Sequence, residues 1–154
     1  MSNELVVFTL DAQHYALPLT SVRRVARMVE VTPLPKAPEI VLGVIDLQGT
    51  IIPVMSMRKR FGLLEPETSL SDQIIVADTA TRRVALVVNS VAGVVERTAQ
   101  EVTDTEKIVP GAQYVEAMTR LEGGILFIHD LDRFLSRKEE QELESLLSQG
   151  TGRG

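Results

Sequence analysis

The sequence has no cysteine, and aromatic residues make up only 4% of its 154 positions. Without cysteine the chain forms no disulfide bond and offers neither a thiolate ligand for zinc nor a cysteine nucleophile. The low aromatic content removes the stacking platforms on which proteins bind single-stranded nucleic acids. A net charge of −5 also argues against general binding to phosphate backbones or anionic lipids. We therefore expect no nucleic-acid partner.

Long apolar runs are absent as well. The longest stretch without a charged residue, Val84–Val95, has twelve residues and is interrupted by Asn89, Ser90 and Gly93. A membrane-spanning helix needs about 20 apolar residues. The N-terminus also lacks the basic, apolar and small-residue segments of a secretory signal. We therefore expect a cytoplasmic protein with no direct membrane insertion.

Patterns for catalysis and for cofactor or metal binding are lacking too. His14 and His129 stand at the ends of expected strands, without the spacing of a metal-binding pair. The sequence has no phosphate-binding loop, dinucleotide fingerprint or nucleophile elbow, and its carboxylate pairs have no distinctive spacing. The residues thus predict no enzyme, no cofactor and no metal site. A small-molecule or enzymatic module on a barrel scaffold stays open as an alternative, since a fold does not fix a function.

The dominant pattern is a series of short runs rich in Val, Ile and Leu, separated by turn residues. So many short strands with so little helix predict a β-barrel or a pair of barrels. The expected strands are Leu5–Leu10, His14–Leu19, Val22–Val31, Gly43–Leu47, Thr50–Met57, Gln73–Asp78, Arg83–Asn89, Val91–Arg97, Val115–Leu121 and Ile125–His129.

Three local features modify this pattern. Pro53 lacks a backbone donor, which favours an edge position or a bulge for its strand. Met57–Phe61 predicts a single helical turn, and a terminal helix is expected to reach Leu147. We expect one domain over residues 4–147 and a flexible tail over residues 148–154.

The segment Gly43–Gly62, which reads GVIDLQGTIIPVMSMRKRFG, resembles the signature of the CheW family. This family comprises the coupling proteins of bacterial chemotaxis and includes the regulatory domain of the histidine kinase CheA. The resemblance extends to Phe8–Leu10, to Ala16 with Leu17, and to the hairpin strand Arg83–Val95. The order and spacing of these segments identify nearly the whole chain, from Leu5 to Leu147, as similar to the family.

The resemblance implies a mainly β fold, with two five-stranded SH3-like barrels packed together, a boundary near residue 80 and a short C-terminal helix. It implies an adaptor that couples the cytoplasmic tip of methyl-accepting chemoreceptors to the regulatory domain of a CheA-type histidine kinase. Other CheW-like domains are implied as further partners, and receptor arrays would recruit the adaptor to the inner face of the membrane. Neither a catalytic residue nor a cofactor is implied.

Several partner-facing positions depart from the family pattern. Arg24 stands where Glu is usual, Asp46 replaces Asn, and Gln48 replaces Arg, while Ser56 and Asn89 each replace Asp. Such changes on a retained scaffold fit either altered partners or a loss of binding. Two alternatives to receptor–kinase coupling stay open, namely a structural ring component and a coupler in a surface-motility or second-messenger pathway. The protein-binding residues implied by the resemblance are Val22, Arg24, Gly43, Asp46, Gln48, Ser56 and Asn89.

Overall fold

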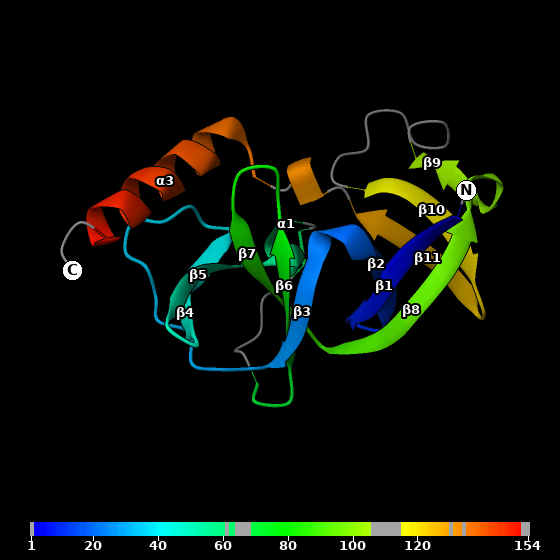
Figure 1. Cartoon of the computed structure of the whole chain (residues 1–154), viewed down its shortest axis with the longest axis horizontal. Coiled ribbons are helices and arrows are strands. Elements are labelled where there is room, and N and C mark those ends of the chain that lie inside the picture. Colours follow the sequence, from blue (N-terminus) through cyan, green and yellow to red (C-terminus); the bar gives the residue numbers. More distant parts are fainter. Residues whose placement is uncertain are drawn as a thin grey trace.

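The computed structural model describes residues 2–60, 62–63, 69–105, 115–129, 131–133 and 135–151. Within these residues the chain forms two β-sheets that lie side by side, with a C-terminal helix next to one of them (Figure 1). A mainly β chain with two sheets and a single long helix was expected from the sequence, and the described residues confirm it.

The first sheet, which we call barrel B, has the expected five strands. It is built entirely from residues 22–88, and the segment that follows its outer strand β3 pairs with the other outer strand, β4, at a single bridge between Thr32 and Val44. In spatial order its strands are β3 (Val22–Arg27), β6 (Gln73–Asp78), β7 (Arg83–Val88), β5 (Thr50–Met55) and β4 (Val41–Leu47).

The second sheet, barrel A, has six strands where five were expected. The additional strand, β9, follows a 3-10 turn at Ala99–Glu101 and spans three residues, too few to show strand periodicity in the sequence. In spatial order the strands are β8 (Ser90–Thr98), β1 (Ser2–Leu10), β2 (Gln13–Pro18), β11 (Gly124–His129), β10 (Val115–Leu121) and β9 (Val102–Asp104).

The chain passes between the two barrels twice, and neither crossing lies near residue 80. It leaves barrel A through a 3-10 turn at Leu19–Ser21 and returns to it at Asn89. A boundary near residue 80 was wrong because that position lies in the turn between β6 and β7, which pair along their full length from Gln73 to Val88. Barrel B is therefore inserted into barrel A.

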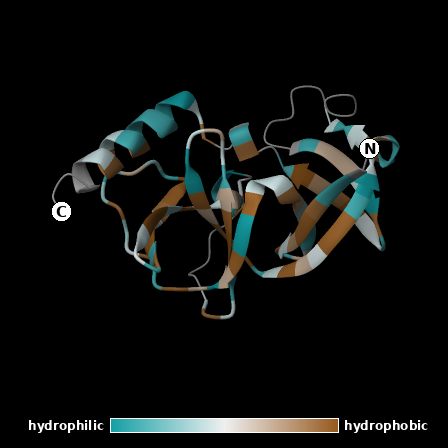
Figure 2. Ribbon diagram, viewed as in Figure 1, coloured by the Kyte–Doolittle hydropathy of each residue, from teal (hydrophilic) through white to brown (hydrophobic). Residues whose placement is uncertain are grey.

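The core has three parts, one inside each barrel and one between them. On β6, Ile74 and Val76 point into barrel B, while Ile75 and Ala77 point into the layer between the barrels. A strand buried on both faces needs apolar residues at every position, which explains the continuous apolar runs of β6 and β7. Figure 2 shows these strands with long hydrophobic segments, whereas much of the C-terminal helix is hydrophilic.

Pro53 lies in an interior strand, so of the two expected positions, an edge or a bulge, the edge was wrong; the irregularity in this pairing lies on the facing strand, between Val41 and Gly43. β5 lies between β7 and β4, and Pro53 stands opposite Val44. Both backbone polar groups of Val44 bond to Thr32, at 2.8 Å each, so this pair exchanges no ladder bonds. The nitrogen of Pro53 thus faces β7, whose pairing with β5 begins only at Val54. No ladder bond is lost.

The expected helical turn after β5 is α1 (Met57–Arg60); Phe61 lies outside the described residues. The terminal helix α3 (Arg137–Thr151) runs past the position at which we placed the flexible tail. It is anchored by Leu143, which is fully buried in the same apolar cluster as residues of both barrels. Residues 148–151 therefore belong to the helix, and residues 152–154 lie outside the described part of the chain.

Candidate functional site: a partner-binding surface

A shallow groove of about 260 Å³ opens on barrel B, between the edge strand β3 and the turn that joins β4 to β5. We call it the seam groove, because it lies between the two outer strands of the barrel. Its floor is formed by Ile52 and Val76, which are 3% and 2% exposed and belong to the interior of barrel B. Its other lining residues are Arg23, Arg24, Leu47, Gln48, Thr50 and Arg83.

Arg24 and Gln48, predicted as two separate partner-binding residues, are joined across the seam groove. The Arg24 Nη1 atom donates a hydrogen bond of 3.3 Å to Gln48 Oε1. Gln48 and Gly49 both have positive φ, at 54° and 89°, as a two-residue type I′ hairpin requires. Asp46 fixes this turn, because its Oδ1 accepts a hydrogen bond of 2.9 Å from the Gly49 nitrogen. Asp46 therefore shapes the groove without lining it.

The rim of the seam groove is positively charged. Arg23 and Arg83 share a single carboxylate, that of Asp78, at N–O distances of 3.7 and 3.0 Å. Within the described residues no carboxylate forms an ion pair with Arg24. Three guanidinium groups thus stand around the groove with one carboxylate, in a chain whose net charge is −5.

Val22 and Gly43 lie close to this surface but do not line the seam groove. Val22 begins β3 and packs, half-buried, against the layer between the barrels. Gly43 has a φ of +153°, and a Cβ atom there would lie 2.2 Å from the carbonyl oxygen of Thr32. The glycine thus allows β4 to approach Thr32 closely, which is a structural requirement.

Ser56 and Asn89, also predicted to bind partners, both make contacts within the molecule, although Ser56 is buried and Asn89 is exposed. Ser56 is 2% exposed, and its Oγ accepts a hydrogen bond of 3.0 Å from the Lys59 nitrogen in the first turn of α1. Asn89 Oδ1 accepts hydrogen bonds from the Asp11 nitrogen at 2.9 Å and from Arg58 Nη2 at 3.0 Å. Ser56 therefore supports the start of α1, and Asn89 secures the second crossing between the barrels.

Sequence reasoning missed the burial of Arg58, although this residue belongs to the signature segment. It is 3% exposed, and its Nε lies 3.2 Å from Asp11 Oδ1. A buried charge requires a partner, and the half-exposed Asp11 supplies one. The burial of Arg58 could have been inferred from its position in the sequence, directly after a buried strand. In the folded chain Arg58 lies opposite the polar turn between β1 and β2.

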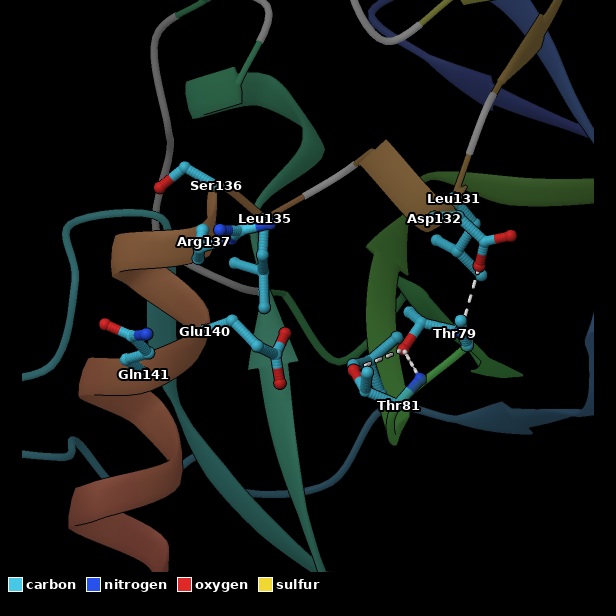
Figure 3. Close-up of a pocket in the computed structure, with 11 residues that line it drawn as sticks. Thr79, Thr81, Leu131, Asp132, Leu135, Ser136, Arg137, Glu140 and Gln141 are labelled. Carbon is cyan, nitrogen blue, oxygen red and sulfur yellow. Dashed lines mark hydrogen bonds between the residues drawn. The ribbon is translucent and has the colours of Figure 1, made fainter.

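A second depression, of about 370 Å³, lies between the β6–β7 turn and the start of α3 (Figure 3). Figure 3 shows Leu135 and Glu140 on one side and Thr79 and Thr81 on the other. Asp132 Oδ1 accepts a hydrogen bond of 2.9 Å from the Ala80 nitrogen and so ties the turn to the segment before α3. None of the residues predicted to bind partners lines this depression.

The described residues contain no cluster of His, Asp or Glu that could hold a metal ion. His14 pairs with Leu126 on β11, three positions from His129 and thus roughly 10 Å away along the strand. The part of the chain that the structure describes also has no helix with the length and apolarity to cross a membrane.

The two barrels expose charged and apolar side chains around a shallow groove. This arrangement is typical of a protein-binding module. The CheW-like domain family matches residues 4–139, and the chain therefore belongs to the CheW-like family. Members of this family are non-catalytic scaffold proteins that act with chemoreceptors and the kinase CheA in chemotaxis, so the chain is not an enzyme.

Curated relatives and a solved structure agree with this assignment. The chain is 26% identical to "Chemotaxis protein CheW" of Treponema pallidum over 149 residues, covering 93% of this chain and 88% of the relative. It is 29% identical to the protein of that name from Thermotoga maritima over 132 residues, covering 86% and 87% of the two chains. The crystal structure of the scaffolding protein TtCheW from Thermoanaerobacter tengcongensis matches with a TM-score of 0.78 and 26% identity, over 90% of this chain and 96% of that one. The expected pair of SH3-like barrels is confirmed, with one strand more than predicted.

Proposed function

We propose that this chain couples chemoreceptors to a CheA-type histidine kinase by binding the receptor's cytoplasmic tip and the kinase's regulatory domain. The observation that carries the proposal is that Arg24 and Gln48 stand exposed at the seam groove while both barrels keep a complete core. Through the receptors, the adaptor is held at the inner face of the membrane and next to other CheW-like domains.

The partner-binding residues of this proposal divide into two groups. Arg24 and Gln48 contact a partner directly, since both line the seam groove. Val22, Gly43 and Asp46 support the same surface through β3, β4 and the hairpin turn. Ser56 and Asn89 act through the internal contacts that fix α1 and the crossing between the barrels.

Binding of the wild type to a receptor tip and to a kinase regulatory domain, both from the same organism, tests the proposal by calorimetry. We expect wild type to bind both, and Arg24→Glu to weaken one of the two interactions by about tenfold, because like charges facing across an interface are unfavourable by up to several kcal/mol. The double change Arg24→Glu with Gln48→Arg introduces the usual family residues at both positions. It should therefore improve binding to partners that are complementary to those residues.

The outcomes separate the alternatives. Binding to the kinase domain and to other CheW-like domains without receptor binding would identify a structural ring component. Binding to neither protein would overturn the proposal. Unchanged affinities in all variants would move the contact surface away from the seam groove.

A further inference from the structure

The charge on the seam groove is not matched within the described part of the molecule. Arg24 donates its hydrogen bond to the neutral amide of Gln48, at 3.3 Å. Arg23 and Arg83 divide one carboxylate, that of Asp78, between them and remain 56% and 43% exposed. The groove therefore has about two positive charges in excess, counted from its lining guanidinium groups and Asp78.

The same groove also has a small apolar part, small because Ile52 and Val76 are almost fully buried. Ile52 and Val76 lie at its base, and Leu47 forms part of its wall. Nearby, Ile51 and Val25 are 54% and 40% exposed on the two flanking elements, although they do not line the groove. An apolar base with a cationic rim excludes basic segments and gives a purely polar segment nothing to bury.

We propose that the seam groove recognises a partner segment in which acidic side chains flank an apolar one. The apolar side chain covers Ile52 and Val76, and the carboxylates accept hydrogen bonds from Arg24 on one side and Arg83 on the other. Guanidinium groups suit this role because their planar donors can hold a carboxylate in a two-pronged fashion. The inference rests on the proposed function only for the natural source of the segment, which is a receptor or a kinase. The charge selection is a property of the groove itself.

The test uses the full chain and two end-capped tripeptides, Glu-Leu-Glu and Gln-Leu-Gln, followed by NMR shifts of the backbone amides. Titration to about 10 mM reaches the weak affinities expected of such short ligands. We expect the acidic peptide to shift amides of β3, β7 and the β4–β5 turn and to bind at least about threefold more tightly than its neutral counterpart. Raising the salt from about 20 to 500 mM should remove the difference, because the charges are exposed.

Variants locate the effect. Arg24→Gln and Arg83→Gln should each weaken binding of the acidic peptide by about two- to fivefold. Arg27→Gln is the matched control, since Arg27 is exposed on the same strand as Arg24 but does not line the groove. Equal binding of the two peptides, shifts outside the groove, or an equal loss in Arg27→Gln would each overturn the inference.

These results are independent of the receptor and kinase measurements. A chain that binds both proteins but shows no preference for the acidic peptide keeps the coupling function and loses the inference. A chain that prefers the acidic peptide but binds neither protein keeps the groove chemistry and loses the coupling function. Thermal unfolding of each variant confirms that the exposed substitutions leave the fold intact.

Discussion

At the scale of single residues, Gly43 has less room for a side chain than any other glycine of the described residues. Its φ of +153° disfavours side chains, and a Cβ atom would meet the Thr32 carbonyl oxygen at 2.2 Å. We expect Gly43→Ala to lower the free energy of unfolding by about 2–4 kcal/mol, because the bridge between Thr32 and Val44 must move apart. Urea denaturation of the purified variant measures this loss.

Gly93→Ala is the matched control. Gly93 also has a positive φ, +138°, but a Cβ atom added there, on β8, would have no atom of the described residues within 4 Å. Its substitution should be unfavourable by only about 1 kcal/mol, from backbone strain alone. Equal losses at both glycines would show that the close approach to Thr32 contributes nothing.

The residue scale is also where the sequence was least informative. A sequence resemblance assigns positions to a surface, but it does not tell whether a polar side chain points outward or into a local network. Ser56 is buried, and Asn89 is exposed but bound to Arg58, and no sequence pattern indicates either hydrogen bond. Arg24 and Gln48 illustrate the reverse case, because their mutual hydrogen bond joins residues 24 positions apart.

At the scale of elements, the strands were predictable, whereas the pairings between strands distant in the sequence, such as β1 with β8 and β2 with β11, were not. Runs of Val, Ile and Leu reported burial directly, which is why nearly all strands of the described residues were found. The position of Pro53 was predicted wrongly because a strand residue needs a backbone donor only where the neighbouring strand would accept its hydrogen bond. Here Val44, the residue opposite Pro53, bonds to Thr32 instead. The short β9 was missed because its pairing with β10, and not its composition, makes it a strand.

The first turn of α3 makes the stability of the molecule depend on pH. Burial raises the pKa of Glu139, but hydrogen bonds from the Ser136 nitrogen and from Arg60 outweigh it, so the pKa lies below its ordinary value of 4.5. The folded state therefore gains stability above pH 4.5, and this gain is lost as the pH falls through the lowered pKa. Arg60 Nη2 lies 2.5 Å from Glu139 Oε1.

We expect Glu139→Gln to destabilise the protein by about 1 kcal/mol at pH 7 and by much less at about pH 3. Urea denaturation at a series of pH values measures the difference between variant and wild type. Glu142→Gln removes a charge from the same helix and serves as the control for net charge. If the two variants differ from wild type by the same amount at every pH, the contacts of Glu139 do not carry the effect.

At the scale of the whole molecule, the two barrels differ in how far apart in sequence their strands lie. Barrel B uses one continuous stretch, residues 22–88, whereas barrel A joins β1 to β8 and β2 to β11 across the inserted barrel. Closing long loops before contacts form is unfavourable, so contacts between distant segments form late. Barrel B should therefore be ordered in the folding transition state before barrel A is complete.

Two valines test this order. Val87 and Val7 are both 3% exposed, one inside barrel B and the other inside barrel A. Val→Ala at either position should lower the free energy of unfolding by about 1–3 kcal/mol. In stopped-flow kinetics Val87→Ala should mainly slow folding, and Val7→Ala should mainly accelerate unfolding. The reverse partition would show that barrel A forms first.

The insertion of barrel B into barrel A has a mechanical consequence. Two bodies joined by one flexible segment can swivel about it, but these two are joined by two segments, at Leu19–Ser21 and at Asn89. Asn89 is additionally fastened to the β1–β2 hairpin through Asp11 and Arg58. A force on one barrel is therefore transmitted to the other through two connecting segments and a shared apolar layer. The two barrels should then move together as one rigid body between the partners bound to them.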